Sequence, residues 1–262
     1  MRRDPRRSYL ALVRSFVLKD LRSRYVGSFV GFFWTAIHPF VELLIYTLVF
    51  TVILKVRFED HYSTATNALY LFVGMIPWFS VSESLGRSTN VIRENAHLIK
   101  KVRFPPSVLC SYIVLSEAFN QVLRLVMFVG AALVLSQGLS WHALLVIPLL
   151  VLQSMFVLGL ALLLSTAQVY FRDIQHLLGP SLMAWLFVTP IFYPARYFPN
   201  EAAPLLVLNP LSHLVGIHRE LLLNQRLPQS GSVVIFGTCA VLALVLGWLT
   251  FSRHSRRFPD LV

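Results

Sequence analysis

The sequence predicts an all-α integral membrane protein with six transmembrane helices. Its 262 residues are 56% hydrophobic and only 13% charged, whereas a soluble domain carries roughly 25% charged residues. The mean hydropathy of the chain is +0.66. The apolar residues form runs close to the ~20 residues that a helix needs to cross a bilayer, and short basic segments separate these runs. We therefore expect residues 1–262 to form a single transmembrane domain.

Residues 8–25 predict an amphipathic helix that lies on the membrane surface before the first span. Apolar side chains recur at helical spacing from Leu10 to Leu21, and Lys19 and Arg22 lie opposite them. Such a helix can bind anionic lipid, dock a cytoplasmic partner or simply anchor the chain. The pattern alone leaves these three roles open.

Six apolar runs predict the membrane spans, at residues 31–54, 67–86, 107–136, 141–168, 174–193 and 232–251. Residues 199–224, between the fifth and sixth spans, are also apolar but too short and interrupted to cross a bilayer. Asn209 and Pro210 form a turn signal inside this segment. We therefore expect two short re-entrant helices that dip towards the membrane from one side.

A charged segment at residues 95–104 separates the second and third spans, and it predicts a short helix. Asn95 is suited to cap its start, and Lys100, Lys101 and Arg103 suit the negative end of its dipole. Because the residue before a proline avoids the helical region, this helix should end near Phe104. The alternative is a solvated loop whose charge only orients the protein in the membrane.

The distribution of basic residues predicts the orientation of the chain. Seventeen Lys and Arg residues fall on the side that carries both termini and the 95–104 segment, and five fall on the side of the re-entrant pair. Cytoplasmic loops carry the excess of Lys and Arg. We therefore expect cytoplasmic termini and re-entrant helices on the outer face. The basic residues that produce the net charge of +11 cluster at the ends of apolar runs, which argues against nucleic-acid binding.

Motifs of enzyme active sites are missing from the sequence. It holds no G-x-x-x-x-G-K-[ST] phosphate loop, no histidine pair at helical zinc spacing and no G-x-S-x-G nucleophile turn. We expect neither catalysis nor a bound metal. Four ionisable residues lie within spans, where charges are costly and often functional: Glu42, Glu83, Glu117 and Arg124. A proton-coupled carrier would use such groups, but Glu117 and Arg124 also suit a structural pair on one helical face.

Aromatic residues are concentrated in the first span and late in the fifth. Most such residues belong to the interface belt and to helix packing. A minority that faces inward would form a ladder on which sugar rings stack. The sequence alone does not separate these two roles.

The motifs together resemble one known family, the membrane subunits of type-2 ABC exporters that move polysaccharides and lipid-linked glycans. The resembling stretches are Arg24–Trp34 with Pro39, Asn95–Pro105, Tyr170–Ile174, Thr189–Pro194 and Asn209–Leu211. They follow the order of the family across nearly the whole chain. Each stretch is weak alone, whereas five in register with six spans form a specific signal.

The resemblance implies a homodimer that works with two copies of a separate cytoplasmic ABC ATPase. ATP and magnesium would bind in that partner, and no cofactor in this chain. The 95–104 helix would be the coupling helix that the ATPase moves. Its contact residues would be Asn95, His97, Leu98, Ile99, Lys100, Lys101 and Arg103. The 199–224 pair would form the outer gate, with Asn209, Pro210, Arg219 and Glu220.

The resemblance also implies where a glycan would pass. The first and fifth spans would line the channel, which makes the aromatic candidates Trp34, Phe40, Phe187, Phe192 and Tyr193. The lipid diphosphate would meet the cytoplasmic gate at Arg22, Arg24, Tyr25, Arg172 and Asp173. The implied substrate is an O-antigen-like lipid-linked polysaccharide, exported across the bacterial cytoplasmic membrane. Teichoic acid or capsule export within the same family and proton-coupled transport remain the alternatives.

Overall fold

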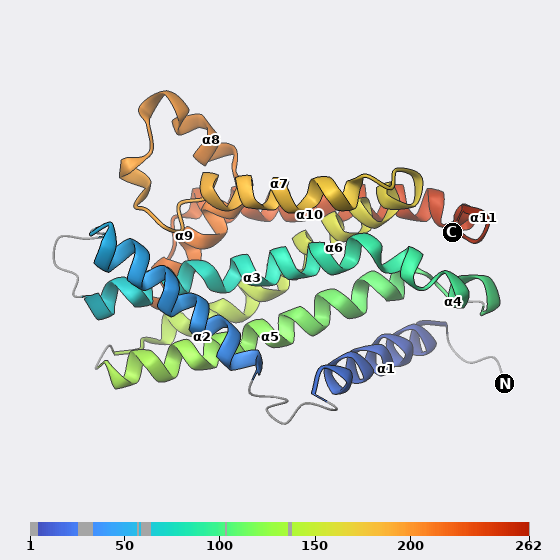
Figure 1. The fold of residues 1–262 in the computed structure, drawn as a ribbon, viewed down its shortest axis with the longest axis horizontal. Helices are drawn as coiled ribbons and strands as arrows, with labels where there is room; N and C mark the ends of the chain where they lie inside the picture. The colour runs from blue at the N-terminus through green and yellow to red at the C-terminus, as the bar shows by residue number, and fades with distance from the viewer. Residues whose placement is uncertain are drawn as a thin grey trace.

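The computed structural model describes residues 5–25, 34–56, 58, 64–102, 104–135 and 138–261. Every regular element in this described part is helical. Long helices run side by side along the long axis of the molecule, with α4 and α11 at one end and α8 and α9 towards the other (Figure 1). The helices are α1 Pro5–Tyr25, α2 Trp34–Tyr46, α3 Thr64–Glu94, α4 Ala96–Lys101, α5 Ser107–Val134, α6 Val146–Tyr170, α7 Ile174–Val188, α8 Ala203–Leu208, α9 Pro210–Leu222, α10 Ser230–His254 and α11 Phe258–Leu261.

Four helices are long and apolar enough to cross a membrane, at Ala65–Glu94, Ser107–Val134, Trp141–Tyr170 and Ser230–Leu261. The segments predicted as the first and fifth spans hold shorter apolar helices, Phe40–Ile53 and Ile174–Val188. The expectation of an all-helical, multi-pass membrane protein is therefore confirmed for the described residues. The count of six spans and the re-entrant path of α8 and α9 remain predictions.

Several helix bounds differ from those expected from the sequence. The helix of the predicted fifth span ends at Val188 instead of Tyr193, because Thr189 precedes a proline and is extended. Helix α3 continues to Glu94, eight residues beyond the predicted end of the second span at residue 86. The segment predicted as the first span changes from α-helix to a π-helix over Thr47–Ile53.

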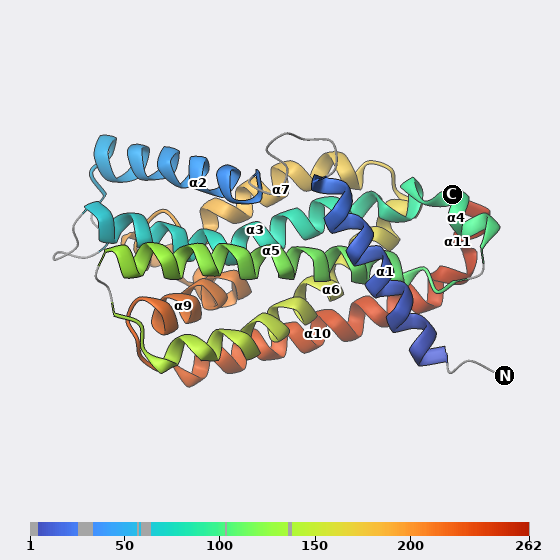
Figure 2. The same cartoon turned by 90° about the horizontal axis from the view of Figure 1, so that it is seen from below.

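Helix α3 is the centre of the molecule and packs against α5, α6, α7 and α9. Its apolar side chains from Leu69 to Phe79 are buried almost without interruption. A helix that is apolar all round is one that other helices surround. Helix α1 packs on the outside of this bundle and crosses obliquely over α5 (Figure 2).

Helices α6 and α10 pack with their backbones in direct contact, which glycine makes possible. A Cβ atom on Gly159 would overlap the backbone of Ala243, and a Cβ atom on Gly247 would overlap the backbone of Gly159. Small residues at such crossings let two membrane helices approach closely, since lipid supplies no hydrophobic force between them. The apolar outer face of α10 is left exposed at Val241, Val245 and Leu249.

Candidate functional site

The predicted coupling helix exists as α4, and it is shorter than expected. It ends at Lys101, with Val102 already extended, whereas the sequence predicts an end near Phe104. The chain turns there towards α5, so the helix stops before the restriction by Pro105 applies. Lys100 and Lys101 occupy its last turn, as predicted. Arg103 lies outside the described residues.

The expected capping role of Asn95 is wrong. Asn95 holds the N-cap position, but its side chain makes no cap hydrogen bond. Instead, its Nδ2 group donates to the carbonyl of Val91 at 2.8 Å, within the last turn of α3. The side chain competes for a local backbone partner, as Asn commonly does. Asn95 therefore forms a tight joint between α3 and α4.

Helix α4 presents one face to the protein and one face to its surroundings. Ile99 is buried in the core, whereas His97, Lys100 and Lys101 are exposed. His97 and Leu98 also line a cavity of about 280 Å³ that α1 borders with Phe16, Lys19, Asp20 and Ser23. The outward face of α4 is thus a small cationic surface, and its inward face is anchored.

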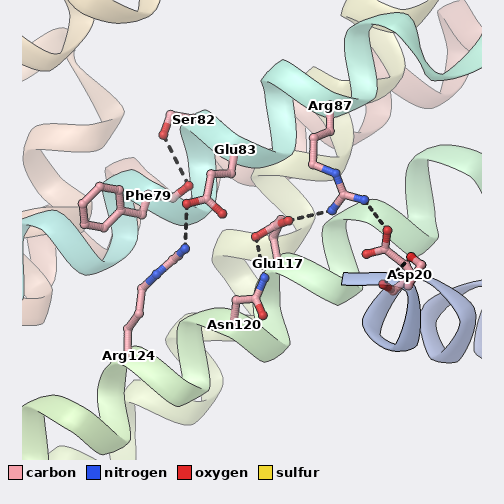
Figure 3. A network of polar contacts seen from close by, with 9 residues as sticks. Asp20, Phe79, Ser82, Glu83, Arg87, Glu117, Asn120 and Arg124 are labelled. Atoms are coloured by element: carbon pink, nitrogen blue, oxygen red, sulfur yellow. Dashed lines mark hydrogen bonds and ion pairs between the residues drawn. The ribbon is translucent and has the colours of Figure 1, made fainter. Parts of the chain in front are cut away.

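A network of ion pairs joins α1, α3 and α5 (Figure 3). Arg87 of α3 pairs with Asp20 of α1 through Nη2 and with Glu117 of α5 through Nη1, the latter at 2.7 Å. The other carboxylate oxygen of Glu117 accepts a hydrogen bond from Asn120 at 2.9 Å. The Glu117 side chain is 0% exposed, and a buried charge requires a partner of this kind.

A second ion pair, between Arg124 and Glu83, also joins α3 and α5 (Figure 3). Arg124 donates to Glu83 at 2.7 Å, and its guanidinium lies 5.1 Å from the ring centroid of Phe79. The two ion pairs show that Glu117 and Arg124 each bind a residue of α3. The sequence suggested that they pair with each other, because helical spacing does not reveal which neighbouring helix supplies a partner.

Glu42, the remaining carboxylate within a predicted span, lies in α2. One of its oxygens is 3.8 Å from Nε2 of His38, one helical turn earlier. The other oxygen is buried and has no hydrogen-bond partner among the described residues. A structural or a functional role for Glu42 therefore remains open.

The predicted channel aromatics fall into two groups. Phe192 is 1% exposed and stacks on Phe50 with ring centroids 4.6 Å apart, with Tyr46 at 4.8 Å. Phe40 and Phe187 are 51% and 50% exposed. The Tyr193 hydroxyl donates to the Phe187 carbonyl at 2.7 Å, and the side chain of Trp34 lies outside the description. Phe40 and Phe187 are thus the most exposed of the described candidates, whereas Tyr193 is partly exposed and Phe192 is buried.

Arg219, a predicted outer-gate residue, is buried and ties α9 to the segment after α7. Its guanidinium donates to the carbonyls of Pro190 at 2.6 Å and Ile191 at 2.9 Å. It also lies 3.6 Å from the ring centroid of Tyr70 on α3. A Cβ atom on Gly74 would come within 2.9 Å of the guanidinium, so Gly74 provides the space. Arg219 holds non-helical carbonyls that would otherwise lack partners.

Asn209 and Pro210 form the turn predicted between the two short helices, and Asn209 also ties this turn to α7. Its side-chain oxygen accepts from the backbone N–H of Leu211 at 3.0 Å and from the Trp185 indole at 2.8 Å. Its Nδ2 group donates to Thr189 at 3.0 Å. Asn209 therefore caps α9, and Pro210 occupies the first helical position.

Glu220, the last predicted outer-gate residue, lies near the end of α9 and pairs with Arg226. Nη2 of Arg226 donates to its carboxylate at 2.9 Å. These hydrogen bonds hold the pKa of the Glu220 carboxyl below its ordinary value. Glu220 and Arg226 thus close the turn that follows α9. The gate role of all four residues remains a prediction.

Three of the predicted diphosphate residues, Arg22, Arg172 and Asp173, have described side chains, and all three are exposed. Arg22 borders a cavity of about 640 Å³ on α1 together with Ser15, Leu18, Lys19 and Ser23. Arg24 and Tyr25 end α1, and their side chains lie outside the description. Arg172 and Asp173 are exposed in the turn before α7. The described contacts do not join these residues to Arg22.

Two polar groups that position the site are not apparent from the sequence. Arg87 is there one basic residue among many, although its spacing of four residues from Glu83 places both charges on one face of α3. The second group is a set of amides, in which Gln168 donates to Asn90 at 3.1 Å and Asn90 donates to Gln175 at 2.7 Å. No local pattern signals these three residues, because they come from three different helices.

The sequence pattern described as "ABC-2 type transporter" matches residues 11–223, from α1 to the end of α9. The chain belongs to the ABC-2 type transporter family. Among curated relatives of this transporter, the O-antigen export system permease protein RfbA of Myxococcus xanthus is 31% identical over 96% of this chain and 95% of its own length. RfbA of Klebsiella pneumoniae is 27% identical over 93% of this chain and 92% of its own length. The polysialic acid transport protein KpsM of Escherichia coli is 21% identical over 90% of each chain.

The predicted family is therefore confirmed, and this ABC-2 chain is a membrane-embedded transport subunit. Its similarity to the relatives covers nearly the full length of both chains, so it extends over α4, the ion-pair network and α9 together. No group of three or more His, Cys, Asp or Glu side chains suited to a metal occurs in the described part. The assignments of individual site residues remain predictions.

Proposed function

We propose that this chain is the channel-forming permease subunit of an ATP-driven exporter of lipid-linked, O-antigen-like polysaccharide. Two copies would form the channel in the bacterial cytoplasmic membrane, with both termini in the cytoplasm, and two copies of a separate ABC ATPase would drive it. The observation that carries the proposal is the similarity to an O-antigen export permease over 96% of this chain. Similarity to a polysialic acid transport protein over 90% of the chain keeps capsule export as the alternative.

Helix α4 is suited to receive the movement of the ATPase. Its exposed His97, Lys100 and Lys101 offer a cationic surface to a partner, and buried Ile99 anchors it to the bundle. The joint at Asn95 attaches α4 directly to α3. A displacement of α4 is therefore passed to α3, since rigid packed helices transmit small shifts.

Helix α3 connects this movement to the surface helix and to the bundle. Arg87 ties it to α1 and α5, and Arg124 ties α5 to it a second time. A shift of α3 would move α1, which carries the predicted diphosphate residues Arg22 and Arg24. The aromatic residues Phe40 and Phe187 would hold the glycan weakly by stacking, which tolerates sequence variation in the sugars.

Charge reversal on α4 tests the coupling role. We expect Lys100→Glu with Lys101→Glu to reduce co-purification of the ATPase and export of glycan together, because the cationic surface becomes anionic. Lys55→Glu is a matched control, since Lys55 is exposed and is predicted to lie on the opposite side of the membrane from α4. Normal co-purification and normal export in the double variant would overturn the coupling role.

The same preparation separates ATP-driven export from proton-coupled transport. An ATP-driven exporter stops when ATP is withheld and continues when the proton gradient is collapsed. A proton-coupled carrier continues without ATP and stops when the proton gradient is collapsed. It also loses transport in the variant Glu42→Gln. Export that is independent of ATP would overturn the proposed function.

A further inference from the structure

The C-terminal end of α10 forms a cationic cleft that the proposed function does not use. The cleft has a volume of about 450 Å³ and is lined by Leu249, Thr250, Arg253, His254 and Arg257. Such a volume suits a small ligand or a headgroup, since ligand pockets run from about 300 to 1,000 Å³.

Within the described part of the chain, no carboxylate pairs with the two arginines of this cleft. Both Arg253 and Arg257 are exposed. Nδ1 of His254 donates to the Thr250 carbonyl at 2.8 Å, and its ring meets Tyr170 edge-on at 5.4 Å. Guanidinium groups favour phosphate, which they bind with paired N–H donors.

The position of the cleft favours a lipid as the source of that phosphate. The outer face of α10 is apolar and exposed up to Trp248 and Leu249, which are 50% and 59% exposed. Arg253 follows one turn later. Trp at the end of an apolar face, followed by cations, marks the boundary between hydrocarbon and headgroups. Leu249 on the cleft wall would then meet an acyl chain where Arg253 meets the headgroup.

From this juxtaposition we infer that the cleft formed by Leu249, Thr250, Arg253, His254 and Arg257 is a binding site for the headgroup of an anionic phospholipid. The site lies at the end of α10 and in the 3-10 turn Ser255–Arg257 that follows it, outside the residues 11–223 that the family pattern matches. None of its residues belongs to the predicted glycan path. The ligand is therefore a bilayer component that binds beside the transport machinery.

The full-length protein in detergent tests this site, with phosphatidylglycerol and phosphatidylcholine as probes and native mass spectrometry as the readout. Wild type should retain phosphatidylglycerol more tightly than phosphatidylcholine. The double variant Arg253→Gln with Arg257→Gln should bind phosphatidylglycerol about 30-fold more weakly, which corresponds to about 2 kcal/mol for two cations at a membrane surface. Arg256→Gln is the matched control: this neighbouring arginine is exposed and does not line the cleft, so its effect should stay within about threefold.

The variant Arg253→Lys with Arg257→Lys should keep most of the affinity for phosphatidylglycerol. Its binding would show that the double Gln variant loses affinity through lost charge and not through misfolding. Equal binding of the two lipids to wild type would overturn the inference. Unchanged phosphatidylglycerol affinity in the double Gln variant would also overturn it. Displacement of the lipid by millimolar inorganic phosphate would assign the cleft to a free anion and overturn the lipid source.

Discussion

Removing the guanidinium of Arg87 should destabilise this protein more than removing any exposed charge. In Arg87→Gln, the carboxylate of Glu117 loses its cation at 2.7 Å while remaining 0% exposed. Asp20, whose side chain is 13% exposed, loses the same partner. Breaking a buried pair by removing one member costs about 3–5 kcal/mol, because an uncompensated charge stays buried. Arg87 is 32% exposed, so we expect the lower end of that range, about 3 kcal/mol.

The assay is equilibrium unfolding in mixed detergent micelles, with wild type and variant compared by their free energies of unfolding. Adding Glu117→Gln to Arg87→Gln should recover more than half of the loss, because the second substitution removes the buried charge. Arg226→Gln is the control. Its side chain is 66% exposed in its pair with Glu220, and such surface pairs contribute less than about 1 kcal/mol. If Arg87→Gln costs no more than Arg226→Gln, or the added Glu117→Gln recovers nothing, the network does not stabilise the fold.

Two further substitutions test how the helices pack. Gly247→Val should lower the free energy of unfolding by at least about 1–3 kcal/mol, because a Cβ atom there overlaps the backbone of α6. Gly86→Val is the control in the same assay, since a Cβ atom on Gly86 meets no described atom outside its own stretch of helix within 4 Å. Equal losses of stability in the two variants would refute the close crossing of α6 and α10. Phe258→Ala removes a ring that is 0% exposed and that anchors α11 on Phe251 of α10. Because α11 contacts α4, hydrogen exchange in α4 should accelerate, whereas Leu261→Ala, which is 45% exposed, should leave it unchanged. Unaltered exchange in Phe258→Ala would show that α11 does not support α4.

Local signals predicted most helix positions well. The pair Pro105–Pro106 marked the start of α5 at Ser107, which is where that helix begins. Asn209 and Pro210 marked the boundary of α8 and α9. In both cases the restriction comes from proline within one or two residues, so neighbours in the chain suffice to impose it. The end of α4 was less predictable, because the turn towards α5 stops it before proline does.

The chemistry of the candidate site was harder to predict than its elements. Arg219 reads in the sequence as an outer cation, whereas the structure buries it against the carbonyls of Pro190 and Ile191. Phe192 reads as a channel aromatic, whereas its ring stacks on Phe50 inside the protein. Both facts depend on elements that are distant in the chain. A one-dimensional pattern shows which residues are unusual, but not which surface they meet.

The sequence by itself determined the class of this protein, since apolar runs of membrane length and basic residues at their ends are properties of composition and order. Its motifs also determined the transporter family. Only the tertiary structure decided that Arg87 joins α1 to α5, that Glu117 and Arg124 bind α3, and that Arg253 and Arg257 border a common cleft. Burial makes these charges consequential, and burial depends on which helices become neighbours. That choice rests on close contacts such as Gly159 against Gly247, which no local stretch of sequence contains.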